Sequence, residues 1–227
     1  MEISLDARYS PSENAQRYYR RYKKLKRLRI VAQGRREEAA QELAFLEGLL
    51  FDLEEARSGE DLAPVEAACE AAGYGEGLAP DAPEKRGRRA AAKGAPALPY
   101  RRFRTAQGWE IFVGKNAMGN DALIRRVGRE GDIWLHAQGL PGSHVLLRAP
   151  EGGSRPGRGE EEAALLRAAA LAAHYSRGRG SGKLAVDWAP YRRVRRPRGA
   201  RPGQVVFTGQ RTVMVPPAGA EDLEETG

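Results

Sequence analysis

The stretch 132–148, DIWLHAQGLPGSHVLLR, indicates how the C-terminal part of the chain folds. Its two apolar runs, 132–136 and 144–148, have the length of β-strands, and the glycines and proline between them are typical of a loop. Residues 109–113 form a further strand-length run, and 121–127 has the pattern of a helix. A compact domain is therefore expected in this part of the chain.

Downstream, the pattern predicts one alanine- and leucine-rich helix and three more strands. The helix is 160–177, and its early glutamates suit the positive end of the helix dipole. The strands are 184–188, 191–195 and 205–215, the last with a turn at Gly209. Strands outnumber helices, and most neighbours lack room for a crossover helix. The sequence therefore predicts an α+β domain with a mixed or antiparallel sheet and two main helices.

The N-terminal residues predict one long helix of the coiled-coil type. Ser10, Pro11 and Glu13 fit a capping box that starts it. Apolar residues then recur alternately every three and four positions, which is the spacing of a heptad seam. The predicted seam consists of Tyr18, Tyr22, Leu25, Leu43, Leu46, Leu50 and Leu53. Because it has no evident partner in the chain, we expect it to self-associate or to bind a partner helix.

The length of this helix leaves one alternative open. Unbroken to about residue 56, the helix would be roughly 70 Å long at 1.5 Å per residue. A break near Gly34 into a two-helix hairpin is the alternative. Residues 61–74 fit one short helix that ends at Gly73, and 75–99 is rich in glycine, proline, alanine and charge. The latter composition favours a flexible basic linker.

Charge is distributed unevenly along the chain. The 227 residues carry 38 Lys or Arg and 30 Asp or Glu, a net charge of +8. Residues 17–36 hold ten bases and no acid, and 101–217 hold 21 bases against nine acids, or +12. A chain this basic is expected to bind an anionic partner, which in the cytosol is most often RNA or DNA. The tail, 221–225, is a short acidic run of a kind that usually stays solvated.

The sequence argues against several classes of protein and site. No run approaches the ~18–20 apolar residues of a membrane span, and the N-terminus lacks the order of a signal peptide. Cys69 is the only cysteine, so a reducing cytosol is expected. Residues 108–115 lack the spacing of a phosphate-binding loop, the histidines lack a third metal ligand, and Ser143-His144 lacks a nucleophile elbow. We expect no catalytic residue, no metal and no cofactor.

The stretch 177–201 carries the strongest indication of function. It contains nine bases against one acid, Asp187, with Trp188 and Tyr191 interleaved. Arginines bind phosphates bidentately and stack on bases, and aromatic rings offer stacking platforms for unpaired bases. The alternative is a solvated face whose arginine stems cover apolar surface. We favour RNA binding by shape and backbone recognition, through Lys183, Arg192, Arg193, Arg195, Arg196, Arg198 and Arg201.

Several short motifs occur in a recognisable order. They are WEIFVGKN at 109–116, ND at 120–121, DIWLH at 132–136, PGSHV at 141–145, AAHYS at 172–176, RPRGARPGQV at 196–205 and VMVP at 213–216. These resemble the NFACT-R domain of the NFACT family, which includes RqcH, NEMF and fibronectin-binding protein A-like proteins. LDAR at 5–8, SPSENAQRY at 10–18 and YKKLK at 22–26 are similar to the tip and returning helix of that family's coiled-coil arm.

The resemblance implies a cytoplasmic factor of ribosome-associated quality control. Family members bind the large ribosomal subunit that still carries peptidyl-tRNA after a stalled ribosome splits. In bacteria they recruit alanyl-tRNA and promote alanine tailing of the nascent chain without mRNA. The implied partners are therefore the large subunit, tRNA and ribosomal RNA, with the arm reaching towards the stalk base and NFACT-R contacting RNA.

Transferred by position, the resemblance also indicates site residues. The candidates for an RNA-binding surface or scaffold are Lys115, Asn116, Asn120, Asp121, His136, Ser143 and His144. For Asn120, Asp121 and Asp132, a role as helix-cap or turn residue is the alternative. Gly119 stands where the family usually has glutamine.

The resemblance divides the sequence into four parts. They are a coiled-coil arm at 1–57, a short helix and basic linker at 58–99, NFACT-R at 100–217 and an acidic tail at 218–227. The family's N-terminal domain, helix-hairpin-helix segment and outgoing arm helix find no counterpart. We therefore expect a non-enzymatic C-terminal half, whose partners include a chain supplying the missing half or a second copy. A coiled-coil interaction adaptor and a fibronectin-binding surface protein are the alternative functions.

Overall fold

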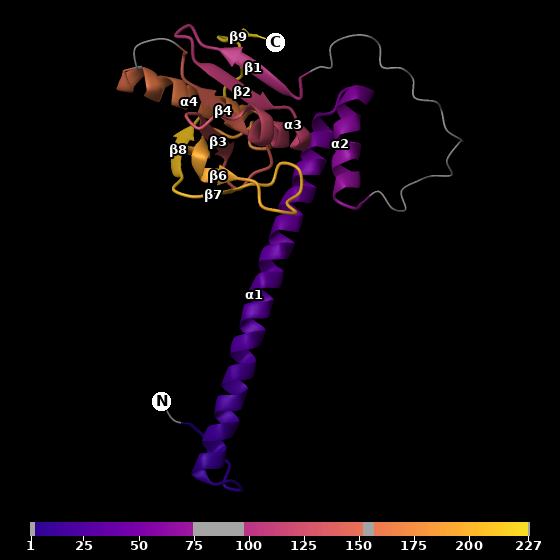
Figure 1. The fold of residues 1–227 in the computed structure, drawn as a ribbon, viewed down its shortest axis with the longest axis vertical. Coiled ribbons are helices and arrows are strands. Elements are labelled where there is room, and N and C mark those ends of the chain that lie inside the picture. The colour runs from indigo at the N-terminus through magenta and orange to yellow at the C-terminus, as the bar shows by residue number, and fades with distance from the viewer. Residues whose placement is uncertain (1–2, 75–97, 152–156, 227) are drawn as a thin grey trace, which may run out of the picture. The chain divides into compact units, whose positions relative to one another are not determined.

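The computed structural model describes residues 3–74, 98–151 and 157–226 (Figure 1). The chain divides into two compact units, Met1–Ala44 and Phe45–Gly227. Helix α1, Pro11–Glu55, is continuous, so the predicted long helix is confirmed and the alternative break near Gly34 does not occur. The basic linker expected at 75–99 lies, up to residue 97, outside the described residues.

Both N-terminal helices begin with capping boxes. At the start of α1, the Ser10 amide donates to Glu13 Oε2 at 2.8 Å, and the Glu13 amide donates to Ser10 Oγ at 3.3 Å. Helix α2, Gly59–Ala71, uses Ser58 and Asp61 in the same way, so it begins before the predicted Asp61. Gly73, at φ +82°, lies just beyond its end, where a left-handed residue favours glycine.

The second unit is built on one seven-stranded sheet, in the order β8-β5-β3-β4-β2-β1-β9. Every adjacent pair is antiparallel, which confirms the α+β class. The strands are β1 Tyr100–Arg104, β2 Glu110–Gly114, β3 Ile133–Ala137, β4 Val145–Arg148, β5 Leu184–Pro190, β8 Arg211–Val215 and β9 Glu224–Glu225. Of these, β1 and β9 were not expected from the sequence.

The central strands are apolar at most positions because both faces of the sheet are covered. Alternate residues such as Ile111, Leu135 and Leu147 pack under α4, Arg158–His174, which lies along one face (Figure 1). The residues between them, such as Trp134, form a second core on the other face. The sequence therefore shows unbroken apolar runs instead of the alternation of a half-exposed strand.

The second face is covered by short elements. They are α3 Ala117–Ala122, the π-helical turn η1 Leu123–Val127, the 3₁₀ turn η2 Tyr191–Arg193, and a two-stranded ribbon of β6 Val194–Arg195 and β7 Val206–Phe207. The strand predicted at 191–195 is therefore wrong over its first three residues. The Tyr191 amide donates to Asp132 O at 2.8 Å, which holds the chain in a turn. The predicted interruption at Gly209 is present, with φ +64°, and it separates β7 from β8.

The acidic side chains of the tail are exposed, as expected, but the backbone of the tail is held against the domain. Glu224 and Glu225 pair with Arg104 and Phe103 of β1, and Asp222 forms an ion pair with Arg167 on α4. Backbone pairing and a charge partner 55 residues away thus anchor the tail to the sheet edge.

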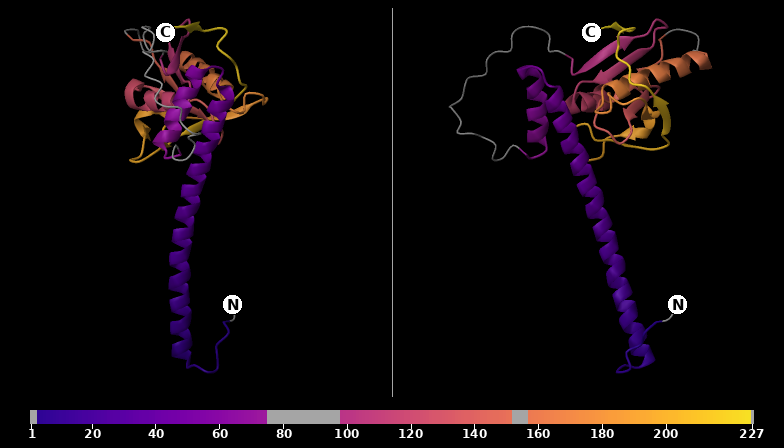
Figure 2. Two further views of the ribbon diagram at one scale, coloured as in Figure 1. Left: turned by 90° about the vertical axis from the view of Figure 1, so that its right-hand side faces the viewer. Right: turned by 180° about the vertical axis from the view of Figure 1, so that it is seen from behind.

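The last turns of α1 bury a face that the heptad pattern did not select. Phe45 and Leu49 pack with Val65 and Ala68 of α2, and the two helices lie side by side (Figure 2). The predicted seam residues are all 41–58% exposed. Pairing of this seam in a coiled coil stays a prediction.

None of the described helices has both the length and the apolar character needed to cross a membrane.

Candidate nucleic-acid interface

The ribbon of β6 and β7 presents arginines because its inward positions are apolar. Val194 pairs with Phe207 and both face the second core, so the next residue, Arg195, faces outward opposite Val206. Arg192 and Arg193 of η2 are also exposed, as is Arg198 in the following loop. Within the described part of the chain, these four arginines have no carboxylate within ion-pair distance. We call Arg192, Arg193, Arg195 and Arg198 the ribbon arginines.

A segment distant in sequence adds positive charge beside the ribbon arginines. The buried Asp121 lies 3.0 Å from Arg196 and 3.5 Å from Arg125 of η1, so one carboxylate serves two guanidinium groups. Tyr191 is held against the same turn, because its hydroxyl donates to Ile124 O at 2.5 Å. Sequence reasoning missed Arg125, because only the tertiary contact between η1 and η2 brings it close.

Other members of the predicted basic stretch lie elsewhere. Lys183 precedes β5 and Arg192 follows it, so the two are separated by roughly 25 Å of extended chain at about 3.3 Å per residue. The Arg201 guanidinium lies over the rings of Phe45 and Tyr74, at 5.0 and 5.4 Å from their centroids. The stretch 177–201 is therefore not one surface. The exposed bases of this stretch without an ion pair among the described residues are the ribbon arginines and, apart from them, Lys183.

The aromatic residues of this stretch are not free stacking platforms. The Tyr191 ring packs so closely on Gly128 that a Cβ there would lie 2.2 Å from it. The guanidinium of Arg211 lies over Trp188 at 5.4 Å. The expected stacking of RNA bases on Tyr191 is therefore not supported by its surroundings, and backbone recognition by arginine remains.

Three aromatic rings lie beneath the ribbon, next to its own Phe207. Trp134 contacts Phe207 at 4.7 Å and His144 at 5.3 Å, and His144 contacts His136 at 5.2 Å between ring centroids. Burial lowers the pKa of His136 to about 4 and places the pKa of His144 well below its usual value. Both rings are neutral at pH 7, so they support the ribbon and supply no positive charge to a phosphate.

The other residues indicated by the family motifs form a buried polar connection. Asn120 accepts from the His144 amide at 2.8 Å and donates to Gly142 O at 3.1 Å, and Ser143 Oγ donates to Gly114 O at 2.5 Å. Asn116 caps α3 by accepting from the Gly119 amide. This geometry fits the scaffold and cap interpretations of these residues, whereas Lys115 is exposed. Direct contact of any of them with RNA stays a prediction.

A buried ion pair fixes the strands that carry this scaffold. Arg148 on β4 donates to both oxygens of Asp132, at 2.9 and 2.7 Å, and to Val127 O at the end of η1. Asp132 also accepts from the Arg129 amide. The two side chains are 9% and 2% exposed. The pair therefore ties η1 to β3 and β4, and its cost of desolvation is offset by several hydrogen bonds.

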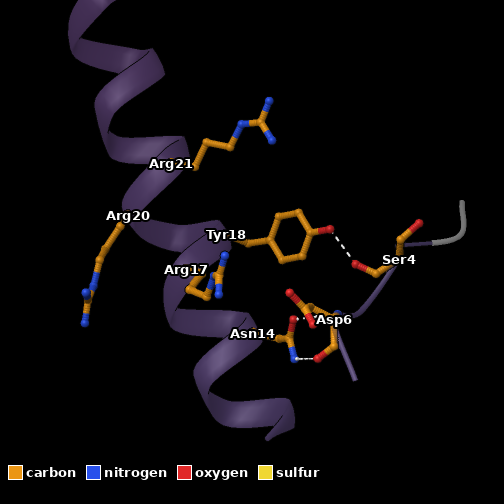
Figure 3. A pocket seen from close by; sticks show the side chains of 7 residues that line it. All are labelled: Ser4, Asp6, Asn14, Arg17, Tyr18, Arg20 and Arg21. Atoms are coloured by element: carbon orange, nitrogen blue, oxygen red, sulfur yellow. Dashed lines mark hydrogen bonds between the residues drawn. The ribbon is translucent and has the colours of Figure 1, made fainter. Parts of the chain in front are cut away.

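The first unit has a second basic feature at the start of α1. The preceding segment folds back on the helix, because Asn14 accepts from the Asp6 amide and donates to the Asp6 carbonyl (Figure 3). Asn14 also donates to the carbonyls of Tyr9 and Ser10. Between helix and segment lies a pocket of about 430 Å³. Its lining residues are Ser4, Asp6, Asn14, Arg17, Tyr18, Arg20 and Arg21.

The pocket is positively charged despite its one acid. The pKa of Asp6 is lowered, chiefly by hydrogen bonds from Arg8, so this carboxylate is ionised and already paired. Three arginines remain in the lining. Arg17 lies 4.1 Å over the ring of Tyr9. The helix continues with further bases, and no acid occurs between residues 17 and 36.

We expect the Asn14→Ala variant to lose this folded-back segment. Asn14 is 4% exposed and makes four hydrogen bonds, and leaving even one buried partner unsatisfied costs about 1–3 kcal/mol. The Asp6 amide should exchange with solvent at least tenfold faster in a hydrogen-exchange measurement, about 1.4 kcal/mol. Gln33→Ala, which removes an exposed amide side chain from the same helix, serves as control. Equal exchange in Asn14→Ala and the parent chain would contradict the role given to Asn14.

The chain matches two protein-family models. Residues 1–85 match the model of the NFACT N-terminal and middle domains, and residues 99–210 match the model of the NFACT protein RNA binding domain. The second match spans the ribbon arginines, η1 and the buried scaffold. The first spans the folded-back segment and α1.

Curated relatives and a solved structure agree with these matches. The chain is 33% identical over 215 residues to the Rqc2 homolog RqcH of Bacillus subtilis and 31% identical over 216 residues to that of Streptococcus pneumoniae. Each alignment includes 95% of this chain but only 35% and 36% of the two relatives, so the chain spans about a third of their length. The C-terminal structure of the fibronectin/fibrinogen-binding protein from Streptococcus suis is 30% identical, with TM-score 0.67, covering 91% of this chain and 77% of that one. The chain belongs to the NFACT family.

Proposed function

We propose that this chain is an RNA-binding module of ribosome-associated quality control, acting in the cytoplasm on large ribosomal subunits that carry a stalled nascent chain. It binds tRNA and ribosomal RNA and has no catalytic role of its own. The observation that carries the proposal is the set of ribbon arginines, which are exposed and have no carboxylate partner in the described residues. The match to the NFACT protein RNA binding domain supports it.

Two further features support a binding role. Ser143 and His144, which together suggest a nucleophile and a base, are buried, and their polar contacts are made within the scaffold. The bases of α1 between residues 17 and 36 provide a second surface for a polyanion. Arginines on both surfaces can contact the phosphate backbone of RNA. Such contacts fix the position of the protein on the RNA and do not depend on the base sequence.

The Arg192→Ala/Arg195→Ala variant tests the proposal. Its affinity for unfractionated tRNA should fall about tenfold or more at 0.1 M salt, because each lost phosphate contact removes the release of counterions. The plot of log affinity against log salt should become shallower by about 1.4–1.8. Fluorescence anisotropy over a range of salt concentrations measures both quantities.

The Arg177→Ala/Arg179→Ala variant is the matched control. It also removes two positive charges, but Arg177 and Arg179 are already paired with Glu54 and Glu55, at 3.1 and 2.7 Å. Its salt slope should stay close to that of the parent chain. Equal losses in both variants would show that net charge alone governs binding and would remove the ribbon from the interface. Co-sedimentation with split large subunits then separates ribosome binding from tRNA binding.

A further inference from the structure

A cleft of about 650 Å³ lies in the second unit and is lined by residues outside the ribbon. Its walls come from the end of α1, the start of α2, the strand β1, the first turn of α3 and the end of α4. Clefts of this size hold one small ligand and are too small for a duplex. The lining contains seven ionisable side chains of Lys, Arg, Asp and Glu, so the balance among them decides what the cleft can bind.

The acids of the cleft are already engaged within the protein. Asp52 accepts from the Ala117 amide at 2.7 Å, and Glu55 forms an ion pair with Arg179 at 2.7 Å. Asp61 accepts from the backbone and side chain of Ser58 in the cap of α2. Burial also raises the pKa of Asp52 to about 7, so this carboxyl carries only part of a negative charge at neutral pH.

Three bases of the cleft are not engaged in the same way. Arg57, Arg101 and Lys115 have no carboxylate within 4 Å among the residues that the structure describes. Arg57 and Lys115 are exposed, and Arg101 is half-buried. Together with Arg179, which pairs with Glu55, the lining holds four bases against three acids, and this small positive excess favours an anionic ligand.

One of these bases lies over an aromatic ring. The Arg101 guanidinium lies over the Tyr175 ring, 4.9 Å from its centroid, and the edge of His174 meets the same ring at 4.9 Å. Leu98 and Met118, 43% and 37% exposed, add apolar surface to the lining. A guanidinium group that lies over an aromatic ring can stack on a nucleobase. Nearby lysine and arginine side chains can then bind the phosphate of the same nucleotide.

We propose that this cleft binds a single unpaired nucleotide of an RNA chain, with the base on the Arg101–Tyr175 pair and the phosphate at Lys115 and Arg57. The proposal rests on the RNA-binding function and adds to it a second site for one nucleotide. An acidic peptide would match the charge but would leave the Arg101 guanidinium without a planar partner.

The full chain titrated with adenosine 5′-monophosphate, followed by amide NMR, tests this site. The amides of Arg101, Lys115 and Tyr175 should shift and saturate. Lys115→Gln should weaken binding about tenfold, and Arg158→Gln, which removes an exposed positive charge outside the cleft, should leave it unchanged. Because the Lys115 side chain is exposed, the variant is expected to fold. Absence of shifts at these amides, or equal affinity in Lys115→Gln and the parent, would overturn the proposal.

Arg101→Lys separates stacking from charge. It keeps the positive charge but loses the planar group, so the preference for adenosine monophosphate over inorganic phosphate should fall severalfold towards unity. An unchanged preference would show that the Arg101–Tyr175 pair does not bind the base. If hexaglutamate shifted the same amides at lower concentration than the nucleotide, the cleft would be a peptide site instead. Normal tRNA binding with no nucleotide in the cleft would refute this inference alone, and absent tRNA binding would refute the proposed function.

Discussion

The Asp132→Ala variant is expected to lose about 3–5 kcal/mol of unfolding free energy, the cost of leaving a buried charge without its partner. Arg148 would keep its charge in a site where it is 9% exposed, with only Val127 O as a hydrogen-bond acceptor. The hydrogen bonds to Asp132 that raise the pKa of Arg148 would be gone, but a guanidinium group keeps its proton at neutral pH without a carboxylate partner. Urea denaturation followed by tryptophan fluorescence measures the loss, since Trp134 lies two residues away in β3.

Two comparisons separate this buried pair from ordinary surface charge. Glu151 pairs with Arg129, and the two side chains are 76% and 61% exposed, so Glu151→Ala should cost no more than about 1 kcal/mol. Replacing both partners, as Asp132→Leu/Arg148→Met, should recover much of the stability, because apolar groups of similar volume often substitute for a buried pair. If Asp132→Ala cost as little as Glu151→Ala, the pair would not organise the junction of η1, β3 and β4.

The elements that could be located from the sequence have either a continuous apolar run or a cap formed by neighbouring residues. The runs at 109–113, 132–136 and 144–148 correspond to β2, β3 and β4, because strands covered on both faces are apolar at most positions. The capping box at Ser10 fixed the start of α1 from residues within one turn. Family motifs supplied the expectation of an RNA-binding domain at the place where the family model matches.

The elements that it missed depend on partners far along the chain. The strand β1, YRRFR, reads as a charged segment, because only Phe103 enters the main core while the backbone pairs with β2 and β9. The heptad pattern selected one face of α1, but Phe45 is buried by contacts with α2. Periodicity within one helix cannot report which of its faces a later element covers.

The candidate site shows the same limit. The charge count pointed to 177–201 as one surface, yet Arg201 packs on Phe45 and Arg196 binds Asp121. Arg125 joins the ribbon only through that same carboxylate. Composition indicates that a domain is basic, whereas the fold decides which guanidinium groups are left for a ligand.

The Asp52→Asn variant is expected to be more stable than the parent chain at pH 8, by about 2–4 kcal/mol. Burial raises the pKa of Asp52 from 3.8 to about 7, and each pKa unit corresponds to about 1.4 kcal/mol. The folded chain thus holds this proton more tightly than the unfolded chain does. The stabilisation from the proton is present below about pH 4 and is lost as pH rises to about 7. Asparagine is neutral and keeps an oxygen to accept from the Ala117 amide.

The pH dependence of the difference between variant and parent isolates Asp52 from the histidines. The lowered pKa of His136 acts in the opposite direction, since its stabilisation is lost as pH falls from 6.5 to about 4, and it is common to both chains. The difference in unfolding free energy should therefore grow between pH 4 and pH 8. Asp61→Asn is the control, because the pKa of Asp61 is lowered by Ser58 and its contribution is constant above about pH 5. A difference for Asp52→Asn that stayed flat from pH 5 to pH 8 would mean that this carboxylate keeps its charge at little cost, through water in the adjoining cleft.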